Sequence, residues 1–238
     1  MPMLPLHDAN PRLYIRVHYV TIGLVIVNVG VFVAMSLLTA AQSYDVVLAH
    51  SVIPARLFEG QQLPEALNAV SPLMSLITYQ FLHGGWAHLI FNIIFLWIFG
   101  DNIEDALGHS RFFLFFLICG AIGGLVHCLV DTTDMTPVIG ASGSISGILG
   151  AYLLLYPRAR LLVLLFMFIP IRLPAMLVIG TFFAQDLLWA ATNSPAALGV
   201  AVWSHIGGFL TGVFLVYYMR RPGIHLFQRS PHPKDRQR

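Results

Sequence analysis

Three short segments of the chain carry residue types that can perform acyl transfer. The first contains His88 and Asn92, the second contains Ser142, and the third contains His205. A serine hydroxyl becomes an effective nucleophile when a base accepts its proton, and neutral histidine suits that task near pH 7. We therefore expect Ser142 to act as the nucleophile and His205 as the general base. The Asn92 amide, the His88 ring N–H and the Ser142 backbone N–H are candidates for an oxyanion hole, because such donors stabilise a tetrahedral oxyanion.

The composition of the chain places these residues in a membrane. Of the 238 residues, 57% are hydrophobic and 10% are charged, whereas soluble domains carry about 25% charged residues. Mean hydropathy is +0.77, and apolar runs recur along the whole length, which excludes an ordinary soluble globule. The net charge of +2 gives no argument for nucleic-acid binding. We expect an all-α fold, a polytopic bundle of transmembrane helices.

Six apolar runs are each long enough to cross about 30 Å of hydrocarbon as a helix. They are Val20 to Ala40, Trp86 to Ile103, Phe112 to Val130, Gly140 to Tyr156, Pro174 to Ala191, and Leu198 to Met219. The shorter stretch Leu161 to Ile169 is predicted to be a connector at the membrane interface. Pro174 suits the first turn of the fifth helix, where a missing N–H costs nothing.

The basic residues test the number of spans independently. With six spans, twelve of the thirteen Lys and Arg residues fall on the side that holds both termini, and only Arg56 falls opposite. Cytoplasmic segments are enriched in Lys and Arg in this way, so we expect both termini to be cytoplasmic and the membrane to be a prokaryotic inner membrane. The expected parts are a cytoplasmic N-terminal segment (1–19), a six-span domain (20–219) and a basic cytoplasmic tail (220–238), disordered from Arg229. The outer side then holds a long connector (42–85), an acidic turn (131–137) and a short loop (192–197).

The predicted topology gives the three segments a common depth. The second, fourth and sixth helices all enter the bilayer from the outer side, and His88, Ser142 and His205 each lie near the start of one of them. At 1.5 Å per residue, they lie about 5 to 10 Å below the outer surface. Water can reach that depth, and polar residues inside spans are costly enough to indicate function.

Two pairs of small residues indicate how the serine and the histidine meet. Gly143 and Gly147 form one small-xxx-small pair, and Gly208 and Gly212 form the other. Such pairs let helix backbones approach closely in lipid. Helix packing explains either glycine pair alone. Because Ser142 and His205 lie at the N-terminal ends of the two pairs, the combination favours a functional site.

The arrangement resembles the rhomboid family of intramembrane serine proteases, from about residue 20 to residue 219. The matching residues are His83, His88 and Asn92, then Glu104, Gly108 and Arg111, then Gly140-Ala141-Ser142-Gly143, and finally His205, Gly208 and Gly212. By this resemblance Ser142 is the nucleophile, His205 the base, and His88 and Asn92 donors to the oxyanion. The resemblance also implies a six-helix bundle that cleaves single-span membrane proteins near the outer end of their transmembrane segment, with no metal or cofactor.

The chain departs from the family pattern at two places. Many members carry an aromatic residue four positions after the nucleophile, where it packs on the catalytic histidine, but this chain has Ser146. Some members also have a Trp-Arg pair in the outer connector, where this chain has Met74 and Ser75. We expect His83 to have a structural role, such as hydrogen bonding to the connector. Asp186 in the fifth span could orient a group in the site, or serve as a gate or packing residue.

Other classes of protein fit the sequence less well. The sequence lacks the His-Glu-x-x-His pattern that would indicate a metalloprotease. The Gly-x-Gly-Asp motif of intramembrane aspartyl proteases is incomplete. A transporter would place its polar groups near mid-membrane, often within a repeat. The alternative that stays open is a non-catalytic rhomboid-like protein that binds or relocates membrane clients. In either case the expected partners are transmembrane proteins and the lipid bilayer.

Overall fold

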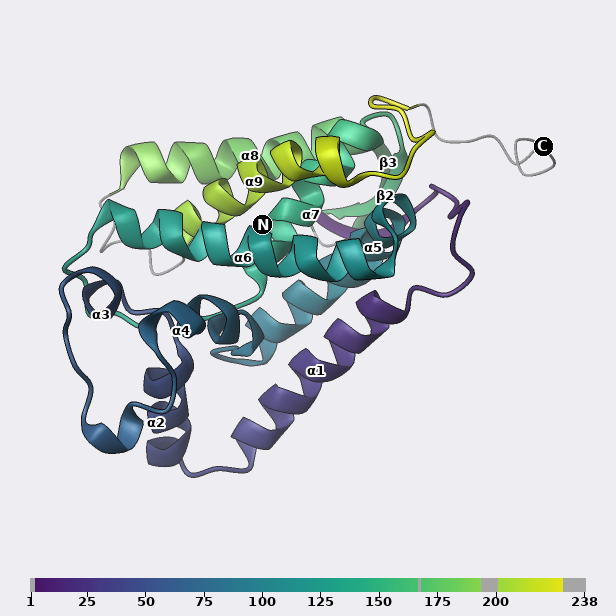
Figure 1. Cartoon of the computed structure of the whole chain (residues 1–238). Coiled ribbons are helices and arrows are strands. Elements are labelled where there is room, and N and C mark those ends of the chain that lie inside the picture. The colour runs from purple at the N-terminus through teal and green to yellow at the C-terminus, as the bar shows by residue number, and fades with distance from the viewer. Residues whose placement is uncertain (1–2, 167, 194–200, 229–238) are drawn as a thin grey trace.

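The apolar runs form helices because, in hydrocarbon, each backbone N–H and C=O must find its partner within the protein. The computed structural model describes residues 3–166, 168–193 and 201–228, and Figure 1 shows it as a bundle of long helices. The long helices are α1 (Tyr19–Ser36), α5 (Trp86–Leu107), α6 (His109–Val130), α7 (Ser142–Leu155), α8 (Ala175–Thr192) and α9 (Val202–Met219). Shorter elements are α2 (Ala40–His50), α3 (Pro54–Phe58), α4 (Pro72–Thr78) and the 3₁₀ turns η1 (Glu65–Leu67) and η2 (Tyr79–Phe81).

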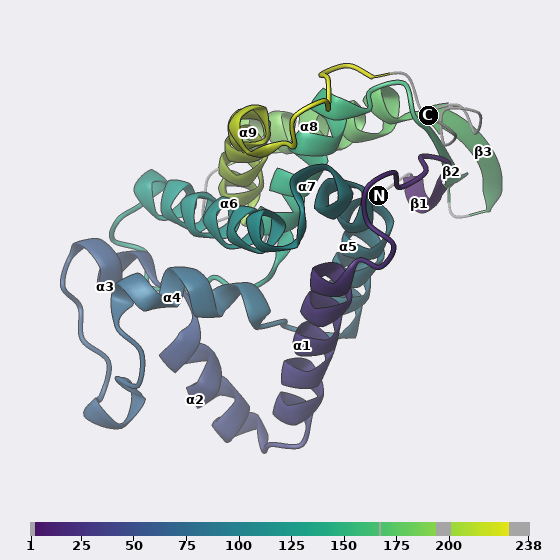
Figure 2. The same ribbon diagram turned by 45° about the vertical axis from the view of Figure 1, so that its right-hand side comes forward.

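The bundle is a polytopic membrane fold with α7 at its centre. Within the described residues, five helices are long and apolar enough to cross a membrane: α1, α5, α6, α8 and α9. The remaining predicted span is α7, which has only 14 residues and packs against α5, α6, α8 and α9 (Figures 1 and 2). A helix of that length is about 21 Å long, so it is shorter than the hydrocarbon core and is enclosed by its neighbours.

Several predicted boundaries were wrong by a few residues. The first span ends at Ser36 rather than Ala40, because the chain turns there and Ala40 begins α2. Pro174 is the N-cap of α8 and the last residue of a strand, not part of the first turn. The predicted start of the sixth span at Leu198, part of the loop 192–197, and the tail from Arg229 lie outside the described residues.

The stretch predicted as an interfacial connector is a β-hairpin, and it pairs with the N-terminal segment. Strands β1 (Met3–Asp8), β2 (Arg160–Leu165) and β3 (Ile169–Pro174) form an antiparallel sheet in the order β1-β2-β3. Met3 pairs with Leu165 and Asp8 with Leu161, about 160 residues away along the chain. The N-terminal segment is therefore an ordered part of the sheet at one end of the bundle (Figure 2).

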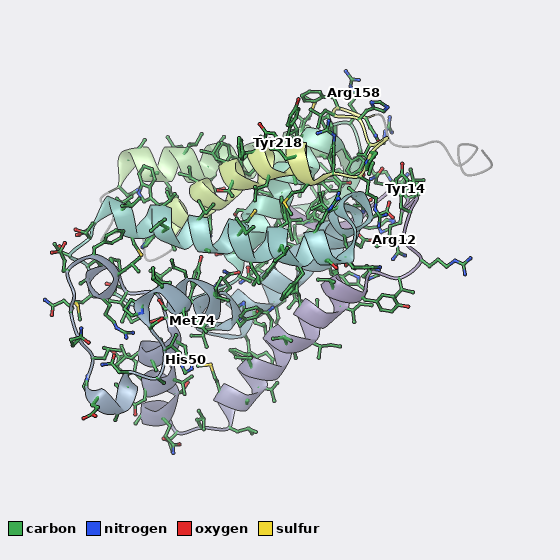
Figure 3. The ribbon with its side chains drawn as sticks, viewed as in Figure 1. Arg12, Tyr14, His50, Met74, Arg158 and Tyr218 are labelled. Atoms are coloured by element: carbon green, nitrogen blue, oxygen red, sulfur yellow. The ribbon has the colours of Figure 1, made fainter. Side chains whose placement is uncertain are left out.

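The outer connector lies at the opposite end of the bundle. Its helices α2, α3 and α4 fold beside α1 and α6, so that His50 and Met74 lie far from Arg12 and Arg158 (Figure 3). The start of α2 is a capping box, in which the Thr39 side chain and backbone exchange hydrogen bonds with Gln42. The buried Arg56 guanidinium donates to the Asn68 side chain and the Val70 carbonyl. The connector is thus held by its own polar contacts.

Two carboxylates at the end of α5 hold the chain that leads into α1. Glu104 accepts hydrogen bonds from the backbone N–H groups of Val20 and Thr21, at 3.0 and 2.8 Å. Asp105 accepts from the N–H groups of residues 13, 14 and 15. Because the first N–H groups of a helix have no partner within it, an acidic side chain there caps the helix and complements its dipole. Glu104 is therefore a cap supplied by a neighbouring helix.

The β1 residue Asp8 leads to a prediction about stability and pH. Its carboxylate is buried and accepts hydrogen bonds from Asn102 and from the Tyr152 hydroxyl, and burial raises its pKa to about 7. Between pH 4 and pH 7 the folded chain therefore holds a proton that the unfolded chain has lost, so this group's contribution to stability falls as pH rises. We expect wild type to lose on the order of 1–3 kcal/mol relative to Asp8→Asn across that window.

Thermal unfolding of both proteins at a series of pH values in detergent checks this. The comparison with Asp8→Asn cancels other titrating groups, including His83, whose pKa is lowered to about 4 by burial and whose contribution runs in the opposite direction. A difference between the two melting temperatures that does not change with pH would show that Asp8 is ionised in the folded protein throughout.

Candidate functional site

The structure brings Ser142 and His205 into hydrogen-bond contact. The His205 Nε2 atom lies 2.9 Å from the Ser142 Oγ atom, which is normal for a nucleophile and its base. Ser142 is the first residue of α7 and His205 lies in the first turn of α9. Because α7 is short, the start of this helix lies within the bundle, and its free backbone N–H groups and positive dipole end point toward the site.

His88 lies against the segment that precedes the serine. Gly140 has φ +124°, and a Cβ atom built on it would lie 2.7 Å from the His88 Nε2 atom. A side chain at residue 140 would therefore be strained by its backbone conformation and would collide with the imidazole. Gly140 is needed at this position because it lets the chain turn into α7 beside the His88 ring.

The outer connector fixes the same segment from the other side. Val138 forms a β-bridge with Val52, and the Gly140 N–H donates to the Tyr79 carbonyl at 2.9 Å. The buried Tyr79 hydroxyl in turn donates to the Gly120 carbonyl of α6 at 2.6 Å. The sequence analysis did not single out Tyr79, since nothing in its spacing distinguishes it from other aromatic residues of the connector.

Glycines set the distance between α7 and α9, as predicted. A Cβ atom built on Gly208 would lie 2.0 Å from the Gly143 carbonyl oxygen, and one on Gly212 would lie 2.0 Å from that of Gly147. Contacts between Cβ and oxygen are never this short in folded proteins, so only glycine allows the two backbones to touch. This contact between the helices places Ser142 and His205 at hydrogen-bond distance.

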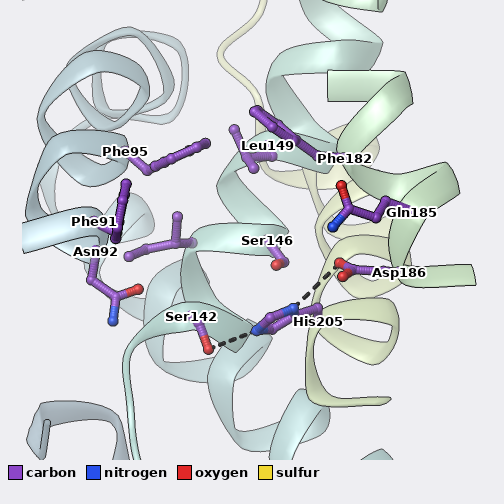
Figure 4. A pocket seen from close by; sticks show the side chains of 11 residues that line it. Phe91, Asn92, Phe95, Ser142, Ser146, Leu149, Phe182, Gln185, Asp186 and His205 are labelled. Atoms are coloured by element: carbon purple, nitrogen blue, oxygen red, sulfur yellow. Dashed lines mark hydrogen bonds and ion pairs between the residues drawn. The ribbon is translucent and has the colours of Figure 1, made fainter. Parts of the chain in front are cut away.

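A cavity of about 110 Å³ opens beside the serine. Asn92, Ser142, Ser146 and His205 line it together with apolar side chains that include Phe91 (Figure 4). The buried Asn92 Nδ2 atom has no hydrogen-bond partner among the described residues. A buried amide without a partner is costly, so this donor is available to an acceptor that enters the cavity.

His83 lies buried beside His88. The side chain is buried, at 4% exposure, but neither ring nitrogen forms a hydrogen bond with the described residues. Its ring instead packs edge-on against His88, with 5.0 Å between the ring centres. This packing against His88 supports the structural role expected of His83.

Asp186 is the site residue whose role the sequence left open. Its Oδ2 atom lies 3.3 Å from the His205 Nδ1 atom, on the side of the ring that faces away from Ser142 (Figure 4). Among the described residues, no group of three or more His, Cys, Asp or Glu side chains is arranged to hold a metal ion. Asp186 and Ser142 contact opposite nitrogen atoms of the His205 ring.

Comparison with known proteins identifies the family. The Rhomboid domain model matches residues 71–222, which is more than half of the chain. The chain belongs to the rhomboid family. The match includes α5, α7 and α9 and therefore all the residues predicted from sequence to form the site.

Relatives of this rhomboid occur in Saccharomyces cerevisiae and Bacillus subtilis. Rhomboid protein 1, mitochondrial, of Saccharomyces cerevisiae is 29% identical over 157 residues, covering 64% of this chain and 43% of the relative. Rhomboid protease GluP of Bacillus subtilis is 32% identical over 139 residues, covering 58% and 24%. Putative rhomboid protease YdcA of the same organism is 40% identical over 78 residues, covering 33% and 39%. The chain thus matches less than half the length of each of these three proteins.

Proposed function

We propose that this rhomboid is an intramembrane serine endopeptidase that cleaves single-span membrane proteins near the outer end of their transmembrane segment. The observation that carries the proposal is the 2.9 Å contact between Ser142 Oγ and His205 Nε2, beside a cavity inside a membrane bundle. Membership of the rhomboid family, which includes relatives named as proteases, supports it. No cofactor takes part in the proposed reaction.

In the proposed mechanism, two residues move the protons. As Ser142 Oγ attacks the scissile carbonyl carbon, its proton passes to His205 Nε2 and the carbonyl oxygen becomes an oxyanion. The C–N bond then breaks, and His205 gives the proton to the leaving amine. Water attacks the resulting acyl-serine and loses a proton to His205. When the acid product leaves, that proton returns to Ser142 and the enzyme is restored.

Three N–H donors stabilise the oxyanion in this mechanism. They belong to the Asn92 side chain, the His88 ring and the Ser142 backbone at the start of α7. The free Asn92 Nδ2 atom supports this assignment, because a preorganised donor acts most strongly where charge develops in a site that excludes water.

We expect Asn92→Ala to lower kcat by about 10²- to 10³-fold and to change KM little, because the donor is used in the transition state more than in the ground state. Kinetics with a reconstituted substrate measure both constants. Asn28→Ala, which removes an amide that bonds only to its own helix, controls for loss of a polar group from a span. A rise in KM at constant kcat would instead place Asn92 in substrate binding.

The substrate class follows from where the site lies. A peptide bond within a transmembrane helix is inaccessible until the helix unwinds, and unwinding costs least near the membrane surface, where water can replace the lost backbone hydrogen bonds. We propose that the side chain beside the scissile bond enters the cavity next to Ser142, and the resemblance to rhomboid proteases favours a small side chain there.

We also propose the orientation and the division of the chain. The segment 1–19 and the tail 220–238 are assigned to the cytoplasmic side and 20–219 to the membrane domain, supported by the asymmetry of the basic residues. The relatives include mitochondrial proteins of yeast and Arabidopsis thaliana, so they do not support a prokaryotic inner membrane in particular.

The test uses purified protein in liposomes, a fluorophosphonate probe and several single-span substrates. We expect the probe to label Ser142, as identified by mass spectrometry of the peptides, and labelled enzyme to lose all cleavage. Several relatives are named only as rhomboid-like proteins. A protein that binds the substrates but neither reacts nor cuts would contradict the proposal and favour the client-binding alternative.

A further inference from the structure

The His205 ring is held between two oxygen atoms from two other helices. Its Nε2 atom lies 2.9 Å from Ser142 Oγ on α7, and its Nδ1 atom lies 3.3 Å from Asp186 Oδ2 on α8 (Figure 4). The Asp186 and His205 side chains are 24% and 17% exposed. Among the described residues, His205 is the only cationic or titratable basic group within ion-pair distance of Asp186.

The packing of α8 on α9 accounts for this contact. Phe183 and Phe209 stack with 4.0 Å between their ring centres and an angle of 15° between their planes. The two helices run in opposite directions. The residue one turn after Phe183 on α8 therefore faces the residue one turn before Phe209 on α9. Those positions are Asp186 and His205. The stacked rings therefore bring the carboxylate to the imidazole, although α8 is otherwise mostly exposed to lipid.

A carboxylate at Nδ1 selects the tautomer that the reaction requires. Neutral imidazole carries its proton on one nitrogen, and a base at Nε2 needs that proton to be on Nδ1. A carboxylate can only accept a hydrogen bond, so Asp186 favours the Nδ1–H form and leaves the Nε2 lone pair facing Ser142. It also stabilises the imidazolium that forms when the serine loses its proton, by charge and by hydrogen bonding.

The small side chain of Ser146 leaves the His205 ring without an aromatic neighbour at this position, so the contact with Asp186 has a larger role in holding the ring. Ser146 lies one turn after Ser142, at the position where many rhomboids have an aromatic residue, and it lines the cavity next to His205. Its side chain has no ring that could pack against the imidazole. An acidic residue in a transmembrane helix is costly to bury, which argues against a role in packing alone.

We propose that Asp186 is a positioning residue that sets the tautomer and orientation of His205, so that the site works as a Ser-His-Asp triad. This inference rests on the proposed protease function. Asp186 contacts the Nδ1 atom of His205 and not the serine, and it acts through the histidine.

The first test is the Asp186→Asn variant in liposome kinetics. An asparagine has nearly the same shape, but it can turn an N–H toward Nδ1 and favour the wrong tautomer. We expect kcat to fall by about 10²- to 10⁴-fold, with KM within about twofold and an unchanged melting temperature. Asp45→Asn, the same change on an exposed face of the outer connector, should match wild type.

A second measurement reports the tautomer without relying on activity. Protein labelled with ¹⁵N-histidine, with the His205 signals assigned by their loss in His205→Gln, should show the Nδ1–H form in wild type and in Ser142→Ala. The Asp186→Asn variant should lose the preference for that form. A purely structural role for Asp186 would alter the melting temperature or KM and leave the tautomer as in wild type.

The outcomes separate the two proposals. Wild type that neither labels nor cuts defeats the protease proposal, whatever Asp186 does. Wild type that cuts, together with an Asp186→Asn variant of equal kcat and the same His205 tautomer, overturns the triad and leaves the protease proposal intact.

Discussion

We expect the Ser142→Ala variant to show no detectable cleavage, a fall of at least about 10⁵-fold in kcat. The proposed reaction passes through an acyl-enzyme on Ser142 Oγ, and alanine has no atom that could form it. The remaining donors could still bind a substrate carbonyl, so we expect substrate to bind with unchanged affinity. Cleavage of a reconstituted single-span substrate and its binding to the variant measure the two effects separately.

His205→Ala should reduce cleavage to the same undetectable level, because without a base the serine stays protonated. Two exposed positions give matched controls: Ser36→Ala, at the end of α1 with a hydroxyl that bonds only to its own helix, and His225→Ala, after α9. Both controls should cleave as wild type does. Residual cleavage by Ser142→Ala would mean that another nucleophile carries the reaction.

The sequence was sufficient to predict the spans and the meeting of Ser142 with His205. An apolar run of about 20 residues can cross the hydrocarbon as a helix, which pairs its backbone groups within itself, so the number and type of the spans follow from the lengths of the runs. The glycine pairs also predict that α7 and α9 approach closely, because only glycine tolerates contact between the two backbones. The prediction that the two helices pack with Ser142 and His205 together is therefore confirmed by the 2.9 Å distance.

The β-sheet could not be predicted in this way. The stretch Leu161 to Ile169 is a short apolar run, and such runs do not distinguish a strand from part of a helix by periodicity. Its partner β1 lies about 160 residues away, and nothing local in Met3–Asp8 specifies that pairing. The hairpin of β2 and β3 is local, but its pairing with β1 is a long-range contact that depends on how the bundle places both segments at one end.

The start of α2 and the contact between Asp186 and His205 were not predicted, for different reasons. The capping box of Thr39 and Gln42 is a local signal for the start of α2, but Thr39 lies within the apolar run predicted as the first span, and that run favours one continuous helix to Ala40. The contact between Asp186 and His205 is not local. It depends on the rotation of α8 about its own axis, which is determined by the stacking of Phe183 on Phe209 and not by any spacing along the chain.

The Gly212→Ala variant should be strongly destabilised. A Cβ atom at this position would lie 2.0 Å from the Gly147 carbonyl oxygen and 2.5 Å from its carbon. These are backbone atoms in the middle of α7, so they cannot rotate away as a side chain could, and α9 must move outward instead. Overpacking of this kind costs about 1–3 kcal/mol or more, and we expect the melting temperature in detergent to fall on the order of 10 °C.

Gly180→Ala provides the matched control because it makes the same change in a spanning helix with open space around it. Apart from the backbone of its own helix and its neighbours in the chain, no atom of the described residues lies within 4 Å of a Cβ atom built on Gly180, and alanine is the better helix former by about 1 kcal/mol. This variant should melt at or slightly above the temperature of wild type. Equal melting temperatures for the two variants would show that α7 and α9 are farther apart than the structure places them, and the distance between Ser142 and His205 would then need another cause.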